Sequence, residues 1–117
     1  MNDLKDRTKA FSLRVIRLVE ALPKGRTSNL IGGQLIRCGT SVGANYRAAS
    51  RAKSKKDFIA KMCIVEEECD EAIYWMELLN ETEIMKESRL SELKTEAEEI
   101  LRIMVASINT AKRNKKD

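Results

Sequence analysis

The chain has 117 residues and a net charge of +4; 43% of its residues are apolar and 34% are charged. This length suits one domain with a modest core, and the single proline and five glycines favour an all-helical protein over a β-sandwich or barrel. The lack of histidine removes the commonest general base and a usual ligand of zinc and di-iron sites. An aromatic content of 4% leaves few rings on which single-stranded bases stack.

The pattern of cysteines and the composition of the N-terminal segment bear on where in the cell the protein is located. The three cysteines, an odd number with no Cys-x-x-Cys pair, argue against a disulfide framework; they are Cys38, Cys63 and Cys69. We interpret them as small apolar residues in a reducing environment. The N-terminal segment has mixed charge and lacks the apolar core of a secretory signal, and no apolar run is long enough to span a membrane. These features predict a cytoplasmic protein.

Two helices are expected in the first half of the chain. The first covers residues 3–22 and is ended by "PKG" at 23–25, because proline cannot continue a helix. Its apolar stripe is Leu4, Phe11, Val15, Leu18 and Leu22. The second covers residues 28–52, and its apolar seam passes through "GTSVGAN" at 39–45 without a change of phase. That seam is Ile31, Leu35, Cys38, Val42, Asn45, Ala49 and Ala52.

Two further helices are expected in the second half. The third covers residues 54–80 and begins at "SKKD", which resembles a capping box because Asp57 follows Ser54 by three residues. Its seam is Phe58, Met62, Val65, Cys69, Ala72, Met76 and Leu79. The fourth covers residues 88–113 and is followed by a frayed basic tail within "KRNKKD". Its apolar face is Leu90, Leu93, Ala97, Ile100, Leu101, Met104, Ile108 and Ala111.

The connections between these helices indicate the architecture. The link between the second and third helices is very short, which allows either a tight antiparallel hairpin or one long kinked rod, and we favour the hairpin. Four amphipathic helices with short links predict an all-α, up-down-up-down four-helix bundle that forms one domain over residues 1–117.

The stretch "GTSVGAN" has two interpretations. Its glycines suggest a phosphate-binding loop, but the lysine of a Walker loop is missing and no strand precedes it. Alternatively, Gly39 and Gly43 lie four residues apart on one helix face and allow another backbone to approach closely. Each glycine costs about 1 kcal/mol relative to alanine inside a helix, which close packing would offset. Ser41 and Asn45 share this spacing, and a seam asparagine is typical of a residue that sets helix register.

Charged segments suggest two kinds of site. Glu67 and Glu71, one helical turn apart within "EEECDE", are candidate ligands of a divalent metal, but the Glu-x-x-His pairs of di-iron bundles are missing. The simpler interpretation is an acidic face that meets basic residues on a neighbour, and we expect no metal or cofactor. A basic cluster lies just before it, where phosphate contact competes with a solvated helix end. Its candidate phosphate-binding residues are Arg47, Arg51, Lys53, Lys55 and Lys56.

The third helix carries more apolar residues than one buried face requires. Ile64, Tyr74, Trp75 and Leu78 lie off its seam, which predicts a second buried surface at a subunit interface. The adjacent acidic and basic segments suit a head-to-tail ring. The expected interface residues are Gly39, Gly43, Tyr74, Trp75 and Leu78.

Four stretches together resemble the 23S rRNA intervening-sequence proteins, a family of four-helix-bundle proteins. They are "LPKG" at 22–25, "QLIRCGTSVGANYRAA" at 34–49, "KKDFIAKM" at 55–62 and "EEECDEAIYWMELL" at 66–79. The resemblance implies an up-down-up-down bundle that assembles as a homopentamer, with no established enzymatic activity. A related branch, the accessory variability determinant of diversity-generating retroelements, is thought to bind a reverse transcriptase and nucleic acid through a basic pentameric barrel.

The resemblance also suggests a polar network. Several positions match the family pattern, namely Gln34, Arg37, Ser41, Asn45, Asp57, Phe58, Glu67, Glu71 and Trp75. Many relatives have glutamate three residues after the asparagine, where this chain has Ala48. A polar network must therefore draw on acids of the third helix, and its expected members are Gln34, Ser41, Asn45, Glu67 and Glu71.

These observations lead to one main hypothesis and two alternatives. We expect a non-enzymatic oligomeric scaffold, a pentamer by family resemblance, that contacts RNA or an RNA-associated protein through its basic cluster. The first alternative is a protein–protein adaptor without nucleic-acid binding, in which the basic cluster pairs subunits. The second is a carboxylate metal enzyme that uses Glu67 and Glu71.

Overall fold

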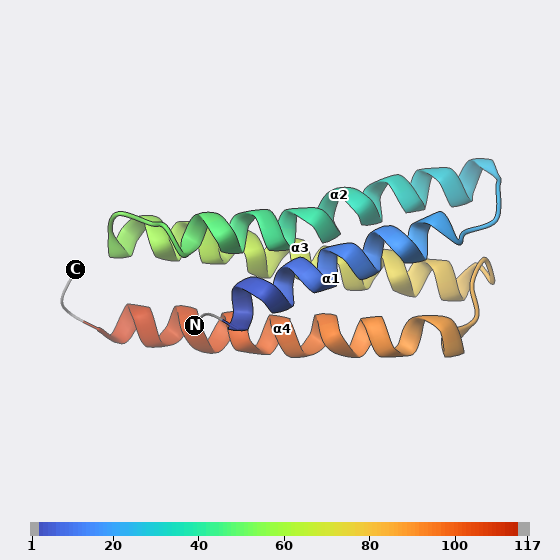
Figure 1. Cartoon of the computed structure of the whole chain (residues 1–117). Coiled ribbons are helices and arrows are strands. Elements are labelled where there is room, and N and C mark those ends of the chain that lie inside the picture. The colour runs from blue at the N-terminus through green and yellow to red at the C-terminus, as the bar shows by residue number, and fades with distance from the viewer. Residues whose placement is uncertain (1–2, 115–117) are drawn as a thin grey trace.

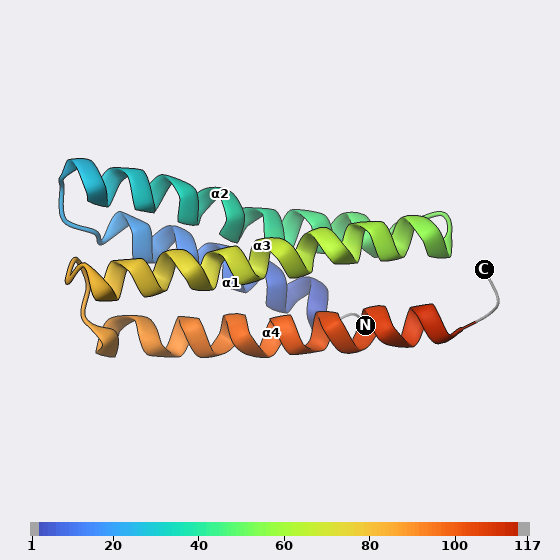
Figure 2. The same ribbon diagram turned by 180° about the vertical axis from the view of Figure 1, so that it is seen from behind.

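The computed structural model describes residues 3–114, and these form four α-helices with no strand among them. The helices are α1 (Asp3–Glu20), α2 (Arg26–Ala49), α3 (Lys55–Glu81) and α4 (Glu87–Arg113). Consecutive helices run in opposite directions and lie side by side in an elongated molecule with extents of 50 × 24 × 18 Å (Figures 1 and 2). The all-α class expected from the sequence is confirmed, and the arrangement is consistent with a four-helix bundle.

The links between helices have clear local causes. α1 ends at Glu20, ahead of Pro23, and the Ser28 hydroxyl in the first turn of α2 donates to the Pro23 carbonyl at 2.6 Å. α2 ends at Ala49, three residues before the expected end. The Ser54 hydroxyl then accepts from the Asp57 amide at 3.0 Å and caps α3, as the "SKKD" pattern predicted. The chain therefore reverses between α2 and α3 as a hairpin (Figure 1).

The hydrophobic core lies along the expected seams of α3 and α4. Six of the seven expected α3 positions are buried, with Phe58 only partly so, and Ile73 joins them. On α4, Leu101 and Ala111 are half-buried and the other six expected residues are buried. The seam of α2 departs from expectation, because Tyr46 is buried in place of Asn45 and Ala52 lies beyond the helix end.

Gly39 and Gly43 allow α1 and α2 to approach closely. A Cβ atom on Gly39 would lie 2.7 Å from a methyl carbon of Val15, and one on Gly43 would lie 2.8 Å from the Ser12 hydroxyl. The Ser12 hydroxyl also donates to the Gly39 carbonyl at 2.9 Å. The space beside both glycines is thus filled within one chain, so we leave Gly39 and Gly43 out of the expected subunit interface.

α1 meets α4 along a much sparser contact, which a charged cluster spans. The Arg7 guanidinium donates to both carboxylate oxygens of Glu96 at 2.7 Å and to Glu99 at 2.8 Å. These bonds lower the pKa of Glu96 and raise that of Arg7. A bidentate arginine–carboxylate pair defines orientation as well as attraction, so this cluster sets how the first turns of α1 lie on α4.

The glycine contact can be tested with two alanine substitutions in the same helix. Gly39→Ala places a methyl group against Val15, and we expect it to lower the free energy of unfolding by about 1–3 kcal/mol through overpacking. Gly33→Ala is the control, because no atom outside its own stretch of helix lies within 4 Å of its added Cβ. It should raise stability by about 0.5–1 kcal/mol through helix propensity. Urea denaturation measures both, and shifts of the same sign would contradict the close contact.

Candidate nucleic-acid interface

The antiparallel topology brings the end of α2, the start of α3 and the end of α4 to one end of the molecule (Figures 1 and 2). Five cations expected from the sequence to contact phosphate lie there, and we call them the basic end: Arg47, Arg51, Lys53, Lys55 and Lys56. Arg47 is on α2, Arg51 and Lys53 are in the link, and the two remaining lysines open α3. The sequence neighbours thus share one end of the bundle because the link turns so tightly.

The five cations of the basic end differ in what they offer a ligand. Arg47, Arg51, Lys53 and Lys56 are exposed. Lys55 is half-buried, and its ammonium donates to the carbonyl of Asn114 just beyond α4. Lys55 therefore ties the start of α3 to the end of α4, and the other four cations present their charge to solvent.

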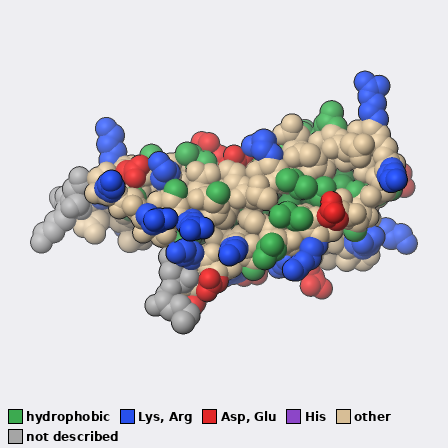
Figure 3. All heavy atoms as spheres, turned by 45° about the horizontal axis from the view of Figure 1, so that its top comes forward, with side chains coloured by type: hydrophobic (Ala, Val, Ile, Leu, Met, Phe, Trp, Pro, Cys, Tyr) green, Lys and Arg blue, Asp and Glu red, His purple; other side chains and the backbone are tan. Residues whose placement is uncertain are grey.

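Two other helices add cations that the sequence reasoning missed or noted only in passing. Lys5 and Lys9 of α1 lie beside Arg47, and Lys112 and Arg113 occupy the last turn of α4. Figure 3 shows Lys and Arg side chains gathered on one part of the surface, with acidic side chains sparse among them. Lys5 and Lys9 are more than 35 residues from Arg47 in sequence, so only helix packing brings them together.

A polar network connects α2 to α3 in the middle of the molecule. The Arg37 guanidinium donates to Gln34 at 3.1 Å, to Glu68 at 3.2 Å, and to Glu71. The Trp75 indole donates to the same Glu71 oxygen at 2.9 Å. Both contacts lower the pKa of Glu71, through the indole hydrogen bond first and then through the hydrogen bond and the charge of Arg37.

The expected polar network is only partly assembled. Gln34 and Glu71 are joined through Arg37, with Glu68 as a further partner. Glu67 is exposed, because Glu68 is the residue on the side of α3 that meets Arg37. Ser41 and Asn45 form a separate pair in which the Asn45 amide donates to the Ser41 hydroxyl at 2.7 Å.

The residues expected at a subunit interface lie on the outer side of α3. Tyr74 is 52% exposed, Trp75 and Leu78 are half-buried, and the two aromatic rings meet edge to face at 5.2 Å. A second set of exposed apolar residues lies on α1 and α2, at Leu13, Ile16 and Leu30. Exposed apolar residues thus lie on α1 and α2 as well as on α3, and Val105 is exposed on α4.

The cysteines and the carboxylates are the side chains of this chain that could react or bind a metal. Cys38 and Cys69 are buried, and burial raises the pKa of each thiol to about 12, so both are neutral thiols. Within residues 3–114, no three His, Cys, Asp or Glu residues are grouped as a metal site. None of the helices in that range is long and apolar enough to cross a membrane.

Comparison with known proteins identifies the family. Residues 2–106 match the model of the 23S rRNA-intervening sequence protein family. The chain also resembles a crystal structure of a protein with unknown function from the S23 ribosomal protein family of Bacteroides thetaiotaomicron. The two chains are 34% identical with a TM-score of 0.83, over 89% of this chain and 96% of the other. No curated protein matches the chain. The chain belongs to the 23S rRNA-intervening sequence protein family, as the four sequence stretches indicated.

The polar network makes a prediction about pH, which the single tryptophan can report. Because the folded-state pKa of Glu71 is depressed, the stability from its ionised form is present above the ordinary glutamate pKa and is lost as pH falls through the lowered value. We expect Trp75 fluorescence to titrate with a midpoint below the usual glutamate range. Arg37→Ala should raise this midpoint, because one source of the depression is lost. Arg26→Ala, at the start of α2, is the control and should leave the midpoint unchanged. An unchanged midpoint in Arg37→Ala would contradict the network.

Proposed function

We propose that this protein is a non-enzymatic, oligomeric scaffold of the cytoplasm that contacts RNA, or an RNA-associated protein, through the basic end. The observation that carries this proposal is the gathering of exposed cations from all four helices and the α2–α3 link at or beside one end of the bundle. Membership of a family described by an rRNA intervening sequence supports RNA as the partner. The second candidate, an RNA-associated protein, would present acidic groups to the same cations.

The chemistry of the basic end favours contact with the phosphate backbone. Its exposed groups are arginine and lysine, which pair with phosphate oxygens through charge and hydrogen bonds. Tyr74 and Trp75, the neighbouring aromatic pair, lie near the other end of α3. Close to these cations, Phe58 is half-buried and Tyr46 is buried, so the proposed binding depends mainly on backbone charge and on salt concentration.

Assembly into a ring is the second part of the proposal. The surface on α3 with Tyr74, Trp75 and Leu78 differs from the surface on α1 and α2 with Leu13, Ile16 and Leu30. Contact between two different surfaces is heterologous, and such contacts close into a ring when the rotation permits. We propose five copies, the number that the family resemblance implies. A ring would present several basic ends to one RNA and increase avidity without new contacts.

The adaptor alternative has one observation in its favour. Glu67 and Asp70 are exposed on α3, in the acidic stretch "EEECDE". In an adaptor, these carboxylates of one subunit would pair with the basic end of the next and neutralise it. Loss of assembly after charge reversal at the basic end would favour this alternative over RNA contact.

RNA binding can be tested by reversing charge at either end of the bundle. In one variant, Arg51, Lys53 and Lys56 are all replaced by glutamate. We expect its RNA affinity in a gel-shift assay to fall by more than about tenfold, with a shallower dependence on salt. The matched control replaces Lys24, Arg26 and Arg89 with glutamate. These residues lie at the opposite end of the bundle, and the control carries the same change in net charge. Equal losses in both variants, or no binding by the unmodified protein at low salt, would refute the proposal.

Assembly can be tested by light scattering at micromolar concentration. The unmodified protein should have several times the 13.3 kDa mass of one chain. Replacing exposed Tyr74 and half-buried Leu78 with glutamate should yield monomers, because burying an unpaired carboxylate is costly. A double replacement of exposed Lys86 and Ser91 with glutamate is the control and should keep the assembled mass. A monomeric unmodified protein would contradict the ring.

A further inference from the structure

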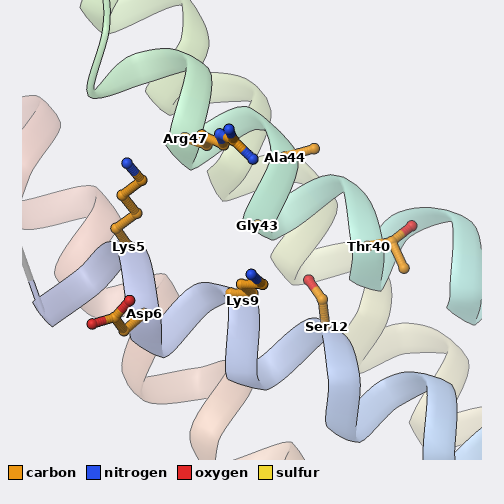
Figure 4. Close-up of a pocket in the computed structure, with 8 residues that line it drawn as sticks. All are labelled: Lys5, Asp6, Lys9, Ser12, Thr40, Gly43, Ala44 and Arg47. Atoms are coloured by element: carbon orange, nitrogen blue, oxygen red, sulfur yellow. The ribbon is translucent and has the colours of Figure 1, made fainter.

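A cleft of about 280 Å³ lies between the first half of α1 and the second half of α2, next to Arg47. Its walls are formed by residues that the two helices bring together from opposite sides (Figure 4). Gly43 lies on the α2 wall, where the absence of a side chain lets the Ser12 hydroxyl and the Thr8 carbonyl of α1 approach closely. The volume suits a unit about the size of one sugar with its phosphate.

The cleft is positively charged. Lys5 and Lys9 lie along the α1 wall and Arg47 lies on the α2 wall, against the single carboxylate of Asp6. In Figure 4, Lys5 extends toward α2, whereas Asp6 points away from it. An anionic group that enters the cleft would therefore meet cations from both helices, at short range and with one wall on each side.

The hydroxyl groups of Ser12 and Thr40 also limit which ligand fits the cleft. The Ser12 hydroxyl donates its proton to a backbone carbonyl, of Gly39 at 2.9 Å or of Thr8 at 3.2 Å. The Thr40 hydroxyl likewise donates to the Ile36 carbonyl at 2.7 Å or to that of Arg37 at 3.3 Å. Because each proton is used within the helices, these oxygens offer only lone pairs to a ligand. A ligand that satisfies the cleft needs an anion for the cations and a hydroxyl donor for Ser12 or Thr40.

A ribose with an attached phosphate has both groups side by side. The 2′-hydroxyl of RNA is adjacent to the 3′-phosphate, and DNA has no hydroxyl at that position. We propose that the cleft binds one ribose–phosphate unit, with the phosphate on Lys9 and Arg47 and the ribose hydroxyl donating to Thr40. This inference rests on the proposed RNA contact and extends it, because it names ribose as the feature that the protein selects.

The test compares RNA and DNA strands of one sequence, each a fluorescent 12-mer with uracil throughout, binding to the full-length protein. We expect fluorescence anisotropy to give RNA an advantage of about three- to tenfold, the size of one neutral hydrogen bond. Thr40→Val removes the acceptor with little change of shape, and it should lower RNA affinity to the DNA value without changing DNA binding. Thr95→Val, on α4, is the control and should preserve the difference. Lys9→Gln should weaken both strands.

The outcomes separate this site from the broader proposal. Equal affinity for RNA and DNA in the unmodified protein would overturn the ribose site and leave phosphate contact by the basic end intact. An RNA preference that survives Thr40→Val would also overturn the ribose site. Binding of uridine 3′-monophosphate with the same sensitivity to Thr40→Val supports the site. If the RNA strand then fails to bind, the RNA contact is lost and the ligand of the cleft is a free ribonucleotide.

Discussion

α1 lies close against α2 because Gly39 and Gly43 have no side chains at the points where Val15 and Ser12 approach. The Ser12 hydroxyl, bonded to the Gly39 carbonyl, holds this contact in register. A larger residue at either glycine would push α1 outward and change which α1 residues face α2. The position of Lys5 and Lys9 beside Arg47 depends on this register, and with it the cleft between the two helices.

Two charged clusters hold the remaining helices around this contact. Arg37 links α2 to α3 through Glu68 and Glu71, and Arg7 links α1 to α4 through Glu96 and Glu99. In these pairs, acidic side chains in the middle of the molecule are bound to arginine. The cations at the basic end have few such partners, since Asp57 pairs with Lys61 within α3. Charge is therefore compensated along the middle of the bundle and left in excess at one end.

The surfaces proposed for assembly and for RNA contact are spatially separate. Tyr74 and Leu78 lie toward the C-terminal end of α3, whereas Lys56 lies in its first turn. At 1.5 Å per residue, about 27 Å of helix separates positions 56 and 74. A subunit can therefore use its aromatic surface for a neighbour while its basic end stays open to a ligand.

Much of the fold follows from the sequence alone. The spacing of apolar residues from Met62 to Leu79 and from Leu90 to Ile108 defines two core-facing stripes, and Ser54 marks the start of α3. These features are local, because the helical repeat and the cap depend only on residues within a few positions of each other. Family membership also followed from short stretches of sequence and was confirmed by the family match.

Only the tertiary structure decided which of two adjacent residues faces a partner. Tyr46 rather than Asn45 enters the core, and Glu68 rather than Glu67 meets Arg37. A step of one residue rotates a side chain by about 100° around the helix, so the choice depends on the neighbouring helix. The cleft depends in the same way on contacts between residues about 30–40 positions apart. The sequence determined four amphipathic helices and their order, and packing between them decided where their polar groups meet.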